Sequence, residues 1–159
     1  MNGKLVAGFI VLTALVAGAA IYYLQEYAYY GPVDPASARA VIHLQPLDGA
    51  AAEPMLMASD FEGIDADSSP LRFRGCFVTP MTLGLLTENF RLYEKPTPLN
   101  APSWFDCFDA DRIGTDLEDG KAVAFLSEEN IAPGVDRVVA VYPDGRAYAW
   151  QQLNESADK

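Results

Sequence analysis

The sequence predicts an α+β protein: an N-terminal transmembrane helix, then a small domain with an antiparallel sheet and two helices. Three observations predict this. Residues 5–24 form one uncharged apolar run, short alternating or wholly apolar segments follow between Gly, Pro and Asp clusters, and two later segments have helical spacing behind capping residues. We divide the chain into a membrane anchor (1–26), a tether (27–38), an α+β domain (39–154) and a tail (155–159).

The N-terminal run is long enough to cross a bilayer. At about 1.5 Å of rise per residue, its 20 residues span the roughly 30 Å hydrocarbon core. Lys4 precedes the run and Glu26 follows it, so the positive-inside tendency places the N-terminus in the cytoplasm and the domain outside. Amphipathic rings favour the outer interface, and this end carries Tyr22, Tyr23, Tyr27, Tyr29 and Tyr30.

A cleaved signal peptide is the alternative to an anchor. The single lysine, the short apolar core and the small residues Ala17, Gly18 and Ala19 match its parts. The apolar run nevertheless continues through Leu24 without the usual polar break, so we expect an uncleaved anchor.

A narrow stripe of small residues follows helical spacing within the run. A second membrane helix could approach closely there, although alanine and glycine are common in membrane helices that pair with nothing. The stripe consists of Ala7, Val11, Ala14 and Gly18.

The tether and the first strand come next. Gly31, Pro32 and Pro35 favour an extended tether, so the fold is expected to start near Arg39. Residues 40–47 (AVIHLQPL) alternate like a strand that stops at Pro46, and a loop follows over 48–54. The pattern from 55 to 67 is mixed and predicts no definite element.

The middle of the domain predicts a strand over 71–78 and then a helix. Thr79 suits the N-cap of that helix and Pro80 its first position. A proline-rich connector follows, and Trp104 and Phe105 after it are expected in the core. Asp109 can cap a second, short helix.

The C-terminal part predicts a buried strand over 123–126 and a hairpin around residues 143–145, whose sequence is Pro-Asp-Gly. Strand side chains alternate between faces. We expect Val139 and Val141 to share a face with Tyr148 or Trp150.

The two cysteines, Cys76 and Cys107, lie too far apart in sequence for a CxxC redox pair. In an oxidising compartment they predict a structural disulfide, and the alternative is two buried thiols. A copper site would have to gather Met55, Met57, Met81, His43 and the cysteines. Core packing of the methionines and a surface role for the histidine explain these residues more simply.

Two acidic runs invite a calcium interpretation. Neither has the glycine and glutamate of an EF-hand loop in place, so solvated acidic faces are the default and weak cation binding is the alternative. The runs are Asp60, Glu62, Asp65 and Asp67, and then Asp106, Asp109, Asp111 and Asp116, of which Asp106, Asp109 and Asp111 are the candidate cation ligands.

Charge and motifs exclude several functions. The net charge is −11 and the basic residues are scattered, so no stripe exists that could bind nucleic acid. The chain lacks phosphate-binding loops, HExxH and CxxCH, and its single histidine disfavours a Ser-His-Asp triad. We predict no catalytic residue, no metal and no cofactor. Paired carboxylates keep a small hydrolase as an alternative.

Four stretches carry a resemblance to a known family. They are MNGKLVAGFIVLTALVAGAAIYYLQEYAYY, FRGCFVTPMTLGLLTENF, WFDCFDADRIG and GVDRVVAVYPDGRAYAWQQLN. Together the chain resembles a family of short, uncharacterised alphaproteobacterial membrane proteins. The resemblance implies a bacterial inner membrane and carries over no functional residue.

These observations favour a non-enzymatic accessory or interaction protein, anchored in membrane lipid, whose outer, periplasmic domain contacts a membrane or periplasmic protein. The alternatives are a sensor module that binds a ligand or a divalent cation, and a carboxylate-dependent hydrolase. A pocket lined by convergent carboxylates would favour the alternatives, and a flat apolar patch the interaction protein.

Overall fold

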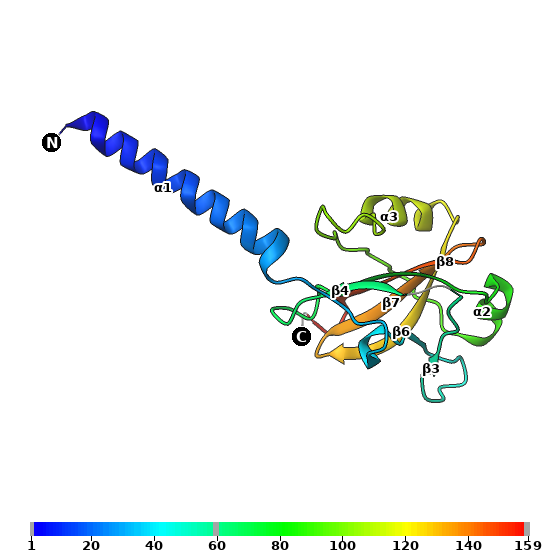
Figure 1. Cartoon of the computed structure of the whole chain (residues 1–159). Helices are drawn as coiled ribbons and strands as arrows, with labels where there is room; N and C mark the ends of the chain where they lie inside the picture. Colours follow the sequence, from blue (N-terminus) through cyan, green and yellow to red (C-terminus); the bar gives the residue numbers. More distant parts are fainter. Residues whose placement is uncertain (1, 59–60, 158–159) are drawn as a thin grey trace. The chain divides into compact units, whose positions relative to one another are not determined.

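The computed structural model describes residues 2–58 and 61–157. The chain forms two compact units that divide between Tyr30 and Gly31. The protein is α+β, with a long apolar helix, an antiparallel sheet of six strands and two further helices (Figure 1).

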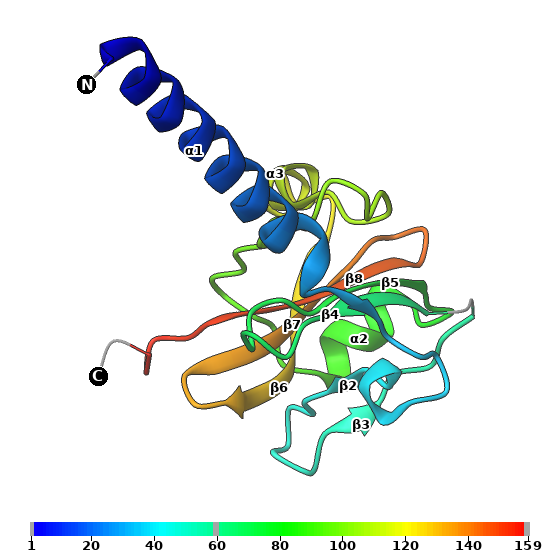
Figure 2. The same ribbon diagram turned by 60° about the vertical axis from the view of Figure 1, so that its left-hand side comes forward.

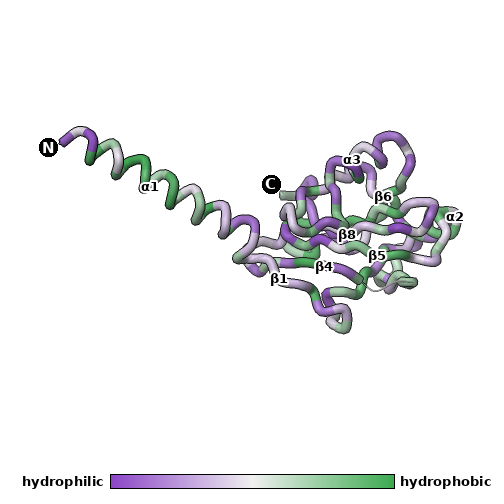
Figure 3. The backbone as a smooth tube through the Cα atoms, turned by 45° about the horizontal axis from the view of Figure 1, so that its top comes forward, coloured by the Kyte–Doolittle hydropathy of each residue, from purple (hydrophilic) through white to green (hydrophobic). Residues whose placement is uncertain are grey.

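The first unit is a single helix. α1 (Gly3–Tyr23) is capped by the Asn2 side chain, and one π-helical turn (Leu24–Ala28) extends it. This continuous helix has 26 residues and none of them is buried, and its most apolar stretch of 18 residues has a mean hydropathy of 2.3. In Figure 3 this helix is coloured as hydrophobic along most of its length and as hydrophilic at its two ends. It is therefore long and apolar enough to cross a membrane, a test that a signal sequence also passes.

The second unit is built on one antiparallel sheet in the order β1-β4-β5-β8-β7-β6 (Figures 1 and 2). Its strands are β1 (Gly31–Pro32), β4 (Glu62–Asp65), β5 (Arg74–Val78), β6 (Val123–Ala132), β7 (Val135–Val141) and β8 (Arg146–Leu153). A two-stranded sheet of β2 (His43–Leu44) and β3 (Glu53–Pro54) accompanies it. The helices are a 3₁₀ turn (Ala38–Ala40), α2 (Leu83–Asn89) and α3 (Ala110–Glu118).

Both faces of the sheet are buried, each under its own hydrophobic cluster. On one face, Leu86 of α2 and the β2 residue Leu44 pack against alternate sheet residues that include Val139. On the other face, Ile113 of α3 and Phe108 pack against a set that includes Trp150. Such double coverage explains why β7 and most of β8 are buried on both sides.

The C-terminal hairpin has the opposite register to the one expected. Its loop has three residues, 143–145: Tyr142 N donates to Arg146 O over 2.9 Å, and Gly145 closes the turn with a φ of 89°. A loop with an odd number of residues pairs even-numbered residues with even-numbered ones and odd with odd. Val138 therefore pairs with Trp150, and Val139 pairs with Ala149. The expectation that Val139 and Val141 share a face with Tyr148 or Trp150 is therefore wrong.

The first helix of the domain begins later than expected. The N-cap of α2 is Thr82, whose side chain accepts from Leu85 N, and not Thr79. Thr79 is occupied elsewhere: its hydroxyl donates to Leu56 O over 2.7 Å and its N–H donates to Gly145 O over 2.8 Å. These bonds hold residues 79–81 outside the helix.

The start of the domain and one core residue also differ from expectation. Gly31 and Pro32 pair with β4, and Val33 is buried, so the fold begins before Arg39. Residues 40, 42 and 44 are buried as the alternation predicts, although only His43–Leu44 is a strand, and its partner β3 lies in the expected loop.

Trp104 is 38% exposed, so its expected core position is wrong, whereas Phe105 packs partly against the α3 cluster.

Candidate functional site

An extended segment forms the first wall of the candidate site. We call residues 92–100 the strap. It begins as a short partner of β6, where Tyr93 N donates to Ala124 O over 2.9 Å. The Tyr93 hydroxyl then donates to Asp136 Oδ2 over 3.1 Å. Burial, reinforced by the Asp136 carboxylate, raises the pKa of Tyr93 to about 12, so this phenol keeps its proton at a higher pH than a free tyrosine does.

Buried polar side chains hold the rest of the strap. Gln152 accepts from Thr97 N over 2.7 Å and donates to Lys95 O over 3.0 Å. Arg74, which is 3% exposed, donates to the carbonyl of Leu99 over 2.7 Å. The strap is therefore fastened to the sheet along its length although it has no regular secondary structure.

α3 forms the second wall and is held at both ends. At its start, the Asp109 side chain caps the helix by accepting from Arg112 N, and the neighbouring Cys107 is bonded to Cys76 of β5. Near its end, Asp116 accepts from the Tyr142 hydroxyl over 2.9 Å. This hydrogen bond is the largest cause of the lowered pKa of Asp116.

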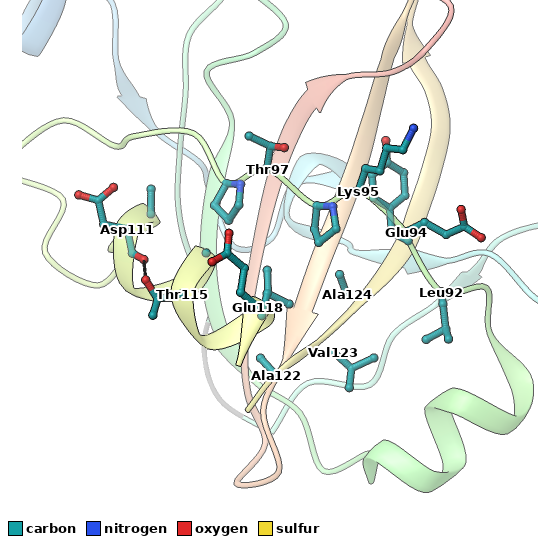
Figure 4. Close-up of a pocket in the computed structure, with 16 residues that line it drawn as sticks. Leu92, Glu94, Lys95, Thr97, Asp111, Thr115, Glu118, Ala122, Val123 and Ala124 are labelled. Atoms are coloured by element: carbon teal, nitrogen blue, oxygen red, sulfur yellow. Dashed lines mark hydrogen bonds between the residues drawn. The ribbon is translucent and has the colours of Figure 1, made fainter. Parts of the chain in front are cut away.

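A groove lies between the strap and α3, above the first residues of β6 (Figure 4). Its volume is about 770 Å³. Small side chains at Ala110, Ala122 and Ala124 leave this space open, and Gly114 of α3 contributes no side chain at all. Both walls are fixed, so the groove is preformed.

The lining combines apolar surface with acidic groups. The apolar part comes from Leu92, Pro96, Pro98, Leu117, Val123 and the alanines. Figure 4 draws the Glu118 carboxylate between α3 and the strap, with Glu94 and Asp111 toward the two ends. Within the described residues, these three carboxylates have no hydrogen-bond or ion-pair partner. Lys95 instead pairs with Glu155 over 2.7 Å.

The strap also borders a second hollow, of about 740 Å³. Its buried polar groups bind one another: Asp136 Oδ1 accepts from Asn130 N over 2.9 Å and from Asn154 Nδ2 over 2.7 Å. Because these groups are already satisfied, this hollow offers a ligand less than the groove does.

The acidic runs do not converge. Arg39 pairs with Asp65 over 3.7 Å and with Asp67 over 3.5 Å, and Lys121 pairs with Asp116 over 3.3 Å. Asp60 lies outside the described residues. Across residues 2–58 and 61–157, no group of three His, Cys, Asp or Glu side chains is placed to hold a metal ion. The candidate cation ligands Asp106, Asp109 and Asp111 are thus not gathered into one such group.

The remaining predicted residues lie as follows. The disulfide joins Cys76 and Cys107, with Cα atoms 6.3 Å apart. In the helical unit, the Tyr27 ring contacts Tyr22 and Tyr23, with centroids 6.2 and 6.1 Å away. The stripe residues Ala7, Val11, Ala14 and Gly18 are all exposed in the chain alone, which leaves their pairing a prediction.

Sequence reasoning missed the groove itself. Glu94 and Glu118 are single acidic residues with no motif, and only the fold brings them to one place. One signal was available: Gly114 interrupts a helical pattern, and an interior helix glycine often has a packing or functional reason.

One family model matches the chain over residues 42–159, that of the family of unknown function DUF6446. No curated protein and no solved structure matches it. The matched region contains both walls and the floor of the groove.

Proposed function

Because the chain belongs to DUF6446, a family of unknown function, we propose its role from the geometry alone: a non-enzymatic binding module, tethered to a membrane, that holds a partner protein in its groove. The observation that carries this proposal is the preformed groove. Its two walls are fixed by buried hydrogen bonds and by a disulfide, and its carboxylates have no hydrogen-bond or ion-pair partner among residues 2–58 and 61–157. Preorganised walls lower the entropic cost of binding.

The tether and its compartment belong to the proposal. α1 supplies a span of the right length, and the charges at its ends favour a cytoplasmic N-terminus. A disulfide persists in an oxidising compartment such as the periplasm. We therefore place the domain outside the inner membrane of a bacterium, an alphaproteobacterium by the resemblance above, as an accessory subunit of a larger assembly.

Non-enzymatic action is favoured by two ionisable groups, Lys95 in the groove and Asp116 near it. General acid or base catalysis works best with a pKa near the operating pH. Hydrogen bonding to Glu155 instead raises the pKa of Lys95, and the Tyr142 hydroxyl lowers that of Asp116. Both shifts move the pKa of the group further from neutral pH.

The test is affinity purification of the full chain from native membranes in mild detergent, followed by mass spectrometry. Gly114→Trp should fill the groove, because Gly114 lines it and a Cβ added there would meet no atom within 4 Å. Gly84→Trp is the matched control, since Gly84 of α2 is equally open and lies outside the groove. A membrane complex that survives Gly84→Trp and is lost in Gly114→Trp supports the proposal. If wild type, Gly84→Trp and Gly114→Trp are all isolated as monomers without a partner protein, the proposal is contradicted.

A further inference from the structure

We propose that the groove binds an extended segment of its partner in which lysine or arginine residues accompany apolar ones. This inference rests on the proposed function and names the chemistry of the bound partner. Among the described residues, three carboxylates and one ammonium line the groove, and that ammonium, on Lys95, is already paired with Glu155. A cationic segment would give these carboxylates the partners that the described residues do not supply.

The apolar floor fits the same side chains. Lysine and arginine place their methylene stems on apolar surface while their charged ends reach polar groups. A stem lying over Ala122 and Ala124 would bring its charge toward Glu118, which Figure 4 places between the walls. Arginine can in addition bind a carboxylate with two parallel hydrogen bonds.

The size of the groove favours a peptide segment over a lone amine. A volume of about 770 Å³ lies within the range of about 300 to 1,000 Å³ that is typical of sites for drug-sized ligands, so a single small amine would leave most of it empty. The outer carboxylates, on Glu94 and Asp111, lie toward opposite ends in Figure 4. A segment with more than one basic residue would engage both ends, and its apolar residues would cover Leu92 and Val123.

The charge of the whole domain would steer such a segment inward. Lys4 and Glu26 cancel, so the net charge of −11 belongs entirely to residues 31–159. Two of the domain's arginines, Arg74 and Arg137, are buried, which leaves its surface still more acidic. A field of this sign speeds the association of cations and weakens with salt.

The experiment selects from a random hexapeptide library displayed on phage, with the full chain held in nanodiscs of uncharged lipid. Wild type, Gly114→Trp and Gly84→Trp are selected in parallel, with empty nanodiscs to remove peptides that bind lipid. We expect wild type and Gly84→Trp to enrich the same sequences, rich in Lys or Arg and in Leu, Val or Pro. Gly114→Trp should not enrich them.

A charge series then tests the recognition of the cation. Glu94→Gln with Glu118→Gln should weaken binding of the best peptide by roughly 5- to 20-fold, because each exposed ion pair contributes modestly. Glu53→Gln with Glu88→Gln changes the net charge equally outside the groove and should leave the affinity within about 2-fold.

The outcomes separate the two proposals. Peptides that bind wild type but not Gly114→Trp, and that lack basic residues, would show that the occupant of the groove is not cationic. The binding role of the groove would remain. Equal losses in both charge pairs would also overturn the cationic occupant, because the attraction would then be general. Selection that yields no peptide, or peptides that bind Gly114→Trp equally well, would overturn the groove as a binding site and both proposals with it.

Discussion

The ring of Phe61 covers two glycines that face each other across β4 and β5. Gly63 pairs with Gly75, and a Cβ on either would collide with that ring; at Gly75 the nearest ring atoms would be 2.5 Å away. The ring also contacts Phe73 and Phe77 in the same hydrophobic cluster. The absent side chains thus make room for the aromatic packing of this face.

We predict that Gly75→Ala lowers the free energy of unfolding by about 1 to 3 kcal/mol, because the added methyl group overpacks a filled core. Gly31→Ala in β1 is the matched control, since nothing lies within 4 Å of its Cβ. Urea unfolding measures both. Combining Gly75→Ala with Phe61→Leu should recover part of the loss, and strictly additive losses would contradict the packing described here.

The two tryptophans offer a second contrast at this scale. Trp150 is fully buried, and its Nε1 donates to Gln152 Oε1 over 3.0 Å, whereas Trp104 is 38% exposed. We predict that Trp150→Ala costs about 3 to 5 kcal/mol and unfolds much of the protein, while Trp104→Ala costs clearly less. Thermal melts of the two variants decide this. A folded Trp150→Ala protein with an unchanged melting temperature would remove Trp150 from the core.

At the scale of elements, the strap depends on side chains that lie far away in sequence. Tyr93 donates to Asp136 in β7, and Gln152 in β8 binds two strap backbone groups. None of these partners belongs to a local pattern. For this reason the sequence showed a proline-rich connector but gave no sign that it forms a wall.

Elements with local signals were predictable. Asp109 caps α3 as expected, the long apolar run forms α1, and the Pro-Asp-Gly turn closes the last hairpin. Errors arose where a distant contact decided the outcome. The bonds of Thr79 to Leu56 and Gly145 displaced a helix start, and the length of one loop reversed which face Trp150 occupies.

A pH titration tests how the strap is fastened. The pKa of Tyr93 is raised from 10.0 to about 12, chiefly by burial and then by Asp136. A pKa that is higher in the folded state stabilises the fold below pH 10, and this contribution disappears as the pH rises through 12. We therefore expect the stability advantage of wild type over Tyr93→Phe to shrink between pH 10 and 12.

Tyrosinate absorbance provides the direct measurement. The difference between wild type and Tyr93→Phe should titrate near pH 12 while the protein remains folded. Asp136→Asn should move that difference toward pH 10, because it removes the neighbouring negative charge. A wild-type difference that already titrates at pH 10 would mean that the Tyr93 hydroxyl is solvated and the strap loose.

At the scale of the whole molecule, the retention of α1 decides whether the acidic domain acts at a membrane. The helix runs without interruption from Gly3 to Ala28, and the 21 residues of α1 alone correspond to about 32 Å at 1.5 Å per residue, enough for a bilayer core. Cleavage after Ala19 would leave Ile21, Tyr22 and Tyr23 at a free terminus in water, and all three are exposed in the chain. An interfacial position for the tyrosines avoids that exposure.

We therefore predict that the mature protein retains its N-terminus and remains in the membrane pellet after alkaline carbonate extraction. Intact-mass spectrometry of the membrane-bound protein measures this, and a mass that begins at Met1 or Asn2 is expected. Replacing Leu12 and Val16 by arginine should release the chain from the pellet, because charges at the centre of a span are costly. A wild-type mass that begins at Ala20 or Ile21 would make this a secreted domain. The groove would then act in solution, without the high local concentration that a membrane tether provides.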